Sequence, residues 1–389
     1  MSTRRDQALL DLASGIAVMG WSMTMLLLPL LALRFGADVA TIGVLVAVAS
    51  LLPLVSAIPI GTYVDRWGAR RLVLIGFLGS VVCLLPMLIH PTLLWLVIAF
   101  VLASAMQNAF IIGAQTLIAS LGNAGRDRES AYGWWTTAMS AGQVVGPFLA
   151  GLMLDALGVR AAFAAVIVTY ATAALVTFAV RTRGSNAAAP SPFRLAQGGR
   201  LLRNRTIGMA VITSSMGVWA MTAQTTFLPV HLESLSWSAA TIGAVLSVRA
   251  IASVIVRPVM PQLVALLGGR EHTVVITLMA LAVSLAGVAT IPTVVSVTLW
   301  LVLFGSGHGL SQPISMVMVA DSVRASERGA ALGVRMTLNR FAQVLAPLSL
   351  AWVASHWGIQ AVLIGHAVIV GVMACIVTAW AFRPARSTV

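Results

Sequence analysis

Residues 61–71 read GTYVDRWGARR, a short charged stretch that separates two long apolar runs at residues 41–60 and 72–89. Each run is long enough to cross a bilayer, because about 20 apolar residues with a rise of ~1.5 Å each span the ~30 Å hydrocarbon core. Asp65, Arg66, Arg70 and Arg71 are therefore expected at a membrane surface. This pattern predicts a membrane protein whose helices are joined by short polar turns.

The composition of the whole chain supports the same class. Of its 389 residues, 59% are hydrophobic and 9% are charged, whereas about 25% of the residues of a soluble globular protein are charged. The mean hydropathy is +0.97, which is typical of a chain with many membrane spans. The net charge of +13 could suggest nucleic-acid binding, but the arginines lie in short loops and form no single basic face.

Apolar runs divide the chain into twelve expected helices. Their predicted bounds are 8–32, 41–62, 71–89, 93–118, 131–154, 160–180, 206–230, 240–262, 272–291, 294–318, 331–354 and 360–382. Residues 181–205 contain SNAAAPSP and six arginines, which is typical of a flexible linker. We therefore expect a six-helix bundle at 1–180, a cytoplasmic linker at 181–205 and a second six-helix bundle at 206–389.

The distribution of arginines predicts the orientation. Most loop arginines, including those of 66–71, 126–128 and the linker, fall on one side of the predicted membrane, and only Arg34 and Arg160 fall on the other. Because cytoplasmic loops are enriched in arginine and lysine, both termini and the linker are expected in the cytoplasm. We expect a multi-pass protein of a bacterial inner membrane.

The two predicted bundles repeat each other at an offset of 200 residues. Thr41-Ile42-Gly43 matches Thr241-Ile242-Gly243, Gly68 matches Gly268, and Gly158 matches Gly358. The charged stretch has no such copy, because Asp65 and Arg66 correspond to Ala265 and Leu266. The repeat predicts two parallel bundles. Because the second bundle lacks a copy of the charged stretch, we expect this stretch to have a role that its counterpart does not share.

Residues 61–71 resemble the loop signature of the major facilitator superfamily, Gly-x-x-x-Asp-Arg-x-Gly followed by basic residues. Gly61, Asp65, Arg66 and Gly68 match it; Ala69 replaces the usual first basic residue, and Arg70 and Arg71 follow. The resemblance implies two six-helix bundles that bind a small molecule between them near the membrane midplane. It also implies that this loop helps to close the cytoplasmic side.

A second pattern lies in the fifth predicted helix. It consists of Gly133, Gly142, Gly146, Pro147 and Gly151. Small residues at helical spacing let helices approach closely, and a proline removes a backbone hydrogen bond. The pattern resembles the antiporter signature of the superfamily, with Ala150 in place of one glycine, and it implies export in the manner of drug and metabolite efflux proteins. The alternative is generic packing of small residues.

The predicted midplane contains basic and neutral polar residues but no carboxylate. A charge there costs at least ~2.5–3.5 kcal/mol on insertion scales, so Arg249 and Arg340 are expected to face a cavity or a partner. The alternative is an arginine that bonds to carbonyl groups or extends to the surface. His308 could carry a proton, or pack as a neutral histidine between two glycines. The substrate-binding candidates are Arg249, Arg340, Asn108, Gln115, Gln143, His308, Asn339, Gln343, Gln224 and Trp135.

These features predict a secondary transporter that exports small amphipathic organic molecules, anionic or zwitterionic ones included, by proton antiport. The alternative is an uptake symporter for organic anions, and a third reading is a membrane sensor that transports nothing. We expect a small-molecule substrate, protons and the lipid bilayer as partners, and function as a monomer. No paired carboxylates, metal-ligand cluster or nucleophile–base set is visible, so we expect neither an enzyme nor a bound cofactor or metal.

Overall fold

A computed structural model describes residues 2–121, 126–181, 204–324 and 327–382, and every element in these ranges is a helix. By their contacts the residues form two compact units. The first is Met1–Ala189 with Leu232–Ser247, and the second is Pro190–His231 with Val248–Val389. Most of the predicted linker, at 182–203, lies outside the described residues, so the predicted division into bundles at 1–180 and 206–389 stays a prediction.

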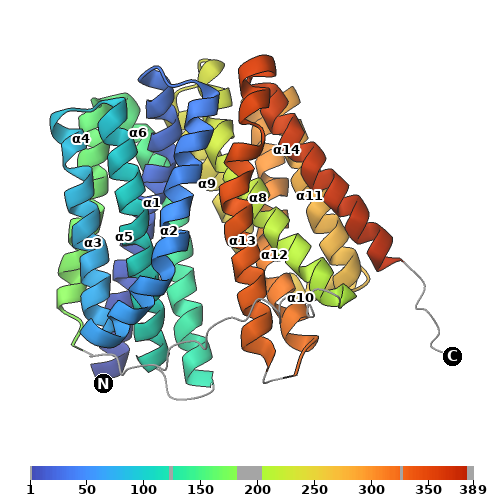
Figure 1. The fold of residues 1–389 in the computed structure, drawn as a ribbon, viewed down its shortest axis with the longest axis horizontal. Helices are drawn as coiled ribbons and strands as arrows, with labels where there is room; N and C mark the ends of the chain where they lie inside the picture. The colour runs from blue at the N-terminus through green and yellow to red at the C-terminus, as the bar shows by residue number, and fades with distance from the viewer. Residues whose placement is uncertain (1, 122–125, 182–203, 325–326, 383–389) are drawn as a thin grey trace. The chain divides into compact units, whose positions relative to one another are not determined.

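The first unit is built on six elements of the N-terminal half (Figure 1). They are α1 (Ser2–Arg34), α2 (Val39–Trp67), α3 (Ala69–Leu84), α4 (Pro86–Ile89), α5 (Leu93–Leu121) and α6 (Arg126–Phe178). Helix α1 packs mainly on α6, and α3 packs on α5. Aromatic side chains such as Phe77, Phe110 and Tyr170 are fully buried between these helices.

The second unit contains the remaining elements. They are α8 (Arg205–Ser234), α9 (Ala239–Val256), α10 (Met260–Leu266), α11 (Arg270–Thr290), α12 (Val294–Asp321), α13 (Arg328–Ser349) and α14 (Ala351–Ala381). The last residues of α8 and the first residues of α9 belong by contacts to the first unit. Leu278, Leu285, Phe304 and Val370 are among the buried residues of the second unit's core.

The described helices confirm the predicted fold class. Helix α6 is interrupted at Gly158 and α14 at Gly358, so each element contains two helices. The part of α14 before Gly358 continues the predicted span that begins in α13. With α4 and α10 as short extensions, the described part of the chain therefore supplies the twelve helices expected from the sequence.

Nine segments of the described chain are long and apolar enough to cross a membrane. One of them, Ala131–Phe178, contains the break at Gly158 and so provides two crossings. Helix α13 is not among the nine, since Arg335, Asn339, Arg340 and Gln343 lower its hydropathy. These polar residues mark α13 as a helix that must direct one face away from lipid.

The repeat seen in the sequence is also a repeat of backbone geometry. Gly68 and Gly268 have φ values of 82° and 83°, and Gly158 and Gly358 have values of 81° and 77°. Gly36, with φ 86°, corresponds to Ser236, with φ 63°. After the turns at Gly36 and Ser236 a side chain caps the next helix. Asp38 accepts a hydrogen bond from the backbone N–H of Thr41 (2.8 Å), and Ser238 accepts one from the backbone N–H of Thr241 (3.1 Å). Hydrogen bonds from Thr41 also hold the pKa of the exposed Asp38 below its usual value.

Ser236 is the one non-glycine residue with positive φ in the described chain. Replacing Ser236 with glycine should raise the free energy of unfolding by about 1 kcal/mol, because glycine adopts this conformation without a clash of its side chain. The reverse change at the matching position, Gly36→Ser, should lower it by a similar amount. Thermal unfolding of the purified protein in detergent measures both. A lower unfolding midpoint for Ser236→Gly would contradict this interpretation.

Candidate functional site

A polar network in the second unit centres on Arg335 of α13. Its Nε donates to Oγ of Ser315 (2.9 Å), and its Nη2 donates to the carbonyl oxygen and to Oε1 of Gln312 (3.2 and 2.6 Å). Arg335 is 5% exposed. The network thus holds a buried guanidinium group between α12 and α13. All of its described hydrogen-bond acceptors are neutral.

Gln312 links this arginine to a third helix. Its Nε2 donates to the carbonyl oxygen of Ser214 in α8 (3.0 Å), and its Oε1 also accepts from Nδ2 of Asn339 (3.4 Å). Oδ1 of Asn339 in turn accepts hydrogen bonds from the hydroxyl groups of Ser214 and Ser215. One side-chain oxygen of Gln312 therefore accepts from both Arg335 and Asn339, while its amide nitrogen is fixed by α8.

Arg249 of α9 is buried, with 6% of its surface exposed. Its Nη1 donates to Sδ of Met221 (2.8 Å), while its Nε is buried without a hydrogen-bond partner among the described residues. His308 of α12 interacts electrostatically with Arg249 and Arg257, and it is hydrogen bonded to the backbone of Gly217. Two arginines and a histidine thus gather between α8, α9 and α12.

Glycines of α12 let α9 come this close. A methyl group at Gly305 would overlap the carbonyl oxygen of Arg249, and one at Gly309 would lie 2.6 Å from the carbonyl oxygen of Ser253. A methyl group at Gly217 of α8 would press on Ser311 and Gln312. The glycines near His308 therefore allow close packing, and they bring the backbone of α9 against α12.

No carboxylate is available along these helices. Between Glu233 and Glu271, between Glu271 and Asp321, and after Glu327, the sequence contains no Asp or Glu. Asp321 is exposed at the end of α12, where it pairs with Arg270 (2.7 Å). The spans of α9 and α13 consequently carry a net positive charge, whereas the only charged residue of α12 is Asp321 at its end.

The other candidates from the sequence lie in varied surroundings. Arg340 donates to Oε1 of Gln343 on the same helix (3.1 Å). Gln224 is fully buried, and neither of its amide atoms has a partner among the described residues. The structure thus brings Asn339 into the network of Arg335 and places His308 near Arg249. Among the described residues, no hydrogen bond joins Arg340, Gln343 or Gln224 to either group.

The candidates of the first unit form local contacts there. Asn108 donates to the carbonyl oxygen of Pro53 (3.1 Å), and Nε1 of Trp135 donates to the hydroxyl of Ser14 (2.9 Å). Gln115 and Gln143 are exposed. Their role in binding stays a prediction.

The charged stretch 61–71 ends α2 and begins α3. Gly68 precedes α3 with φ 82°, and Arg70 donates to the carbonyl oxygens of Thr177 (3.4 Å) and Phe178 (2.8 Å) at the end of α6. Arg70 thus satisfies carbonyl groups that a helix end leaves without partners. Arg66 and Arg71 are exposed. The side-chain surroundings of Gly61 and Asp65 lie outside the described part of the chain, so the predicted gating role of this stretch stays a prediction.

The glycine pattern of α6 faces two neighbours within the first unit. Methyl groups at Gly142 and Gly146 would collide with backbone atoms of α1, and a methyl group at Gly151 would overlap the carbonyl oxygen of Ala239 at the start of α9. Gly243 of α9 meets the carbonyl oxygen of Pro147 in the same way. Gly133 has open space around it. Four of the five pattern positions therefore lie where helices touch backbone to backbone.

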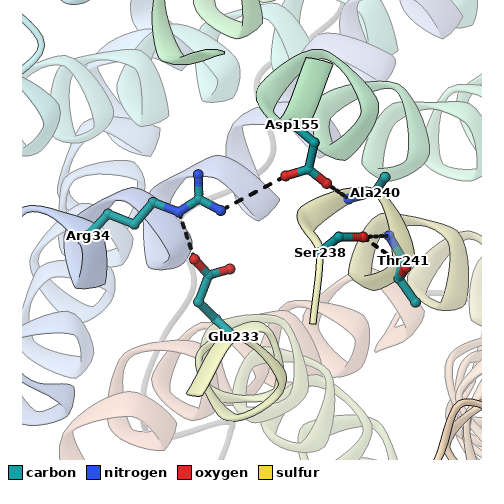
Figure 2. A network of polar contacts seen from close by, with 6 residues as sticks. All are labelled: Arg34, Asp155, Glu233, Ser238, Ala240 and Thr241. Atoms are coloured by element: carbon teal, nitrogen blue, oxygen red, sulfur yellow. Dashed lines mark hydrogen bonds and ion pairs between the residues drawn. The ribbon is translucent and has the colours of Figure 1, made fainter. Parts of the chain in front are cut away.

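An ionic network joins the ends of these helices in the first unit (Figure 2). Arg34, the last residue of α1, donates from Nε to Oε1 of Glu233 (2.6 Å), and its Nη2 lies 4.0 Å from Oδ1 of Asp155. The other oxygen of Asp155 accepts a hydrogen bond from the backbone N–H of Ala240 (2.7 Å). A carboxylate thus meets the positive end of α9.

Sequence reasoning missed several of these residues. Gln312, Ser214, Ser215 and Ser315 were not among the candidates, although a glutamine in an apolar span next to Pro313 was a usable signal. Arg335 was not among the candidates either. The network of Figure 2 joins residues about 200 positions apart, and nothing in their local sequence indicates the pairing.

Asp155→Ala should lower the free energy of unfolding by about 1 kcal/mol, because the N–H of Ala240 loses its acceptor and the N-terminus of α9 loses a nearby negative charge. Asp155→Asn keeps an acceptor oxygen and should cost less. Thermal unfolding at low and high salt measures the two parts, since salt screens the charge term alone. An unchanged midpoint for Asp155→Ala would show that the contact carries no stability.

Gln312→Leu should lower the free energy of unfolding by roughly 1–3 kcal/mol, because it leaves buried donors of Arg335 and Asn339 without an acceptor. Gln143→Leu changes an exposed glutamine on α6 and should stay within about 0.5 kcal/mol of the wild type. Thermal unfolding compares the two variants with the wild type. Equal effects would mean that Gln312 does not hold the network together.

Comparisons with known proteins agree with this architecture. The model of a family described as Major Facilitator Superfamily matches residues 10–234 and 210–389. The tetracycline resistance protein of class C from Escherichia coli is 24% identical over 343 residues, which are 84% of this chain and 84% of that protein.

Solved structures share the fold at low identity. The nucleoside transporter NupG superposes with a TM-score of 0.81 at 16% identity, over 97% of this chain and 100% of that chain. A bacterial homologue of the human lysosomal transporter Spinster gives a TM-score of 0.77 at 12% identity, over 98% of this chain and 96% of that chain. The matched family model covers most of the chain, and the family consists of transporters and not of enzymes. The chain belongs to the major facilitator superfamily.

Proposed function

We propose that the chain is a secondary transporter that exports small amphipathic organic molecules, anionic and zwitterionic ones among them, by alternating access. The observation that carries the substrate class is the charge of the second unit. Arg249, Arg335 and Arg340 lie within α9 and α13, and their described hydrogen-bond partners are neutral. No acidic residue lies within the same helices.

The physical argument is one of charge compensation. A guanidinium group inside the membrane is costly unless an opposite charge or a well-formed set of acceptors meets it. Arg335 has three acceptors, whereas Arg249 has a thioether and a free Nε. A substrate with an acidic group supplies the missing charge, and an amphipathic body suits the apolar helices around it.

Export is supported by two further observations. Gly142, Gly146 and Gly151 lie at backbone contacts of α6, as expected if the glycine pattern is an antiporter signature. The distant relative from Escherichia coli is a resistance protein, and resistance to a drug is consistent with its removal from the cell. Uptake of organic anions by symport is the second candidate, and the arginines of α9 and α13 are the observation that favours it.

The remaining parts of the proposal come from the sequence. The chain would lie in a bacterial inner membrane with both termini in the cytoplasm, act as a monomer and use protons as the coupling ion. The arginine distribution and the bacterial relative support the location. The described helices of the second unit offer no carboxylate as a proton carrier, so proton coupling rests on the resemblance to efflux antiporters.

Accumulation of matched cationic and anionic fluorescent amphiphiles in cells that lack their own pumps tests this function. Cells that express the protein should accumulate the anionic set several-fold less than cells without it. Arg340→Gln should restore anionic accumulation more than cationic accumulation, because it removes one positive charge from α13. A protonophore added during the assay tests the predicted proton coupling.

Arg270→Gln is the matched control, since Arg270 is an exposed arginine already paired with Asp321. It should export like the wild type. Higher accumulation of the anionic set in expressing cells would support uptake instead. Equal effects of Arg340→Gln on both sets would remove the charge argument.

A further inference from the structure

We propose that Arg249 binds a carboxylate and that the transporter exchanges one carboxylate for another across the membrane. This inference rests on the proposed function, names the acidic group of its substrates and replaces the predicted proton with a second anion. It is carried by the buried Nε of Arg249, which has no partner among the described residues, and by the absence of acidic residues from the spans of α8, α9 and α12 around it.

The contacts of Arg249 leave one nitrogen of its guanidinium group without a hydrogen-bond partner among the described residues. Nη1 is engaged with Sδ of Met221, and Nε is buried without a partner in the described part of the chain. Nε and Nη2 form the side edge of the group, whose two parallel N–H bonds match the two oxygens of a carboxylate. A carboxylate on this edge would satisfy Nε and neutralise the charge at once.

The surroundings favour an anion over any other ligand. His308 of α12 lies within electrostatic range of Arg249 and of Arg257, an arginine that directly follows α9. Arg257 donates to Oγ of Ser253, one turn away on α9 (3.4 Å). No acidic residue is present in α9, in α8 before Glu233, or in α12 before Asp321. A cation would therefore meet only repulsion here.

The same charge explains why exchange is expected. Alternating access passes through a state that is closed to both sides, and in that state Arg249 cannot be solvated by bulk water. A bound carboxylate offsets the cost of burying this charge, so the loaded carrier crosses the closed state more readily than the empty carrier. When each crossing requires a bound carboxylate, outward movement of one compound is tied to inward movement of another.

The carboxylate site is tested first without any transport. The purified full-length protein is unfolded thermally in detergent at constant ionic strength, with phthalate or with its neutral analogue phthalamide. Phthalate should raise the unfolding midpoint and phthalamide should not. Arg249→Gln should weaken the phthalate effect by roughly 10- to 100-fold in concentration, the factor that follows from loss of a charge-assisted hydrogen bond.

Arg270→Gln serves again as the control and should keep the phthalate effect. Because each protein is compared with and without ligand, a lower basal stability of Arg249→Gln does not obscure the result. An equal response to phthalate and phthalamide, no response, or a response that survives in Arg249→Gln would overturn the site.

Exchange is tested in liposomes that contain the protein and are loaded with carboxyfluorescein at a self-quenching concentration. External phthalate should speed the release of the dye several-fold, and phthalamide should not. The release should be unaffected by a protonophore. Arg249→Gln should lose the response to phthalate, and Arg270→Gln should keep it.

The outcomes separate the two proposals. Release driven by a proton gradient and indifferent to external phthalate would overturn exchange and leave the proposed export function standing. Loss of anionic export in the cell assay, combined with phthalate-dependent stabilisation of the purified protein, would overturn the export function and keep the carboxylate site. No release under any condition would contradict both exchange and the transport of anionic compounds.

Discussion

The cost of placing a charge inside a membrane-spanning helix is the constraint on which this structure depends. Most of the chain meets it by keeping charges in the turns, as in residues 61–71. Helices α9 and α13 do not, because Arg249, Arg335 and Arg340 lie within them. Each must be compensated by something other than a carboxylate of the same helices. This requirement organises the polar side chains of the second unit and points to the ligand.

Compensation takes two different forms in the second unit. Arg335 donates from Nε to Ser315 and from Nη2 to Gln312, and Gln312 is itself fixed by Ser214. Such a network holds its members in one geometry, and it needs no ligand to compensate the charge of Arg335. Arg249 is buried to the same degree, but its Nε has no hydrogen-bond partner among the described residues. The contrast distinguishes an arginine that positions its neighbours from one that is available for binding.

The sequence was sufficient for the parts of the fold that depend on local pattern. Apolar runs predict the helices, and the repeat at an offset of 200 pairs Gly68 with Gly268 and Gly158 with Gly358, positions that prove to share a positive φ. It was not sufficient for side-chain partners. The hydrogen bonds of Arg335 to α12 and of Arg34 to Glu233 join residues of different helices. Such pairs depend on how the helices pack, which cannot be read from the pattern of a single sequence. Arg70, predicted as part of a gate, is seen to cap the end of α6, a role that needs the position of another helix.

The two halves of the repeat have diverged in a consistent direction. The first half keeps the charged turn at 61–71 and the glycine contacts of α6, which are features of helix packing and helix ends. The second half has lost the charged turn and has gained arginines in α9 and α13, which are features of charge inside the membrane. Position 249 corresponds to Ala49, position 340 to Ser140 and position 335 to Trp135, so the first half has uncharged residues where the second has guanidinium groups. The two halves therefore share one scaffold. The arginines present only in the helices of the second half are the residues to examine first in a search for the substrate.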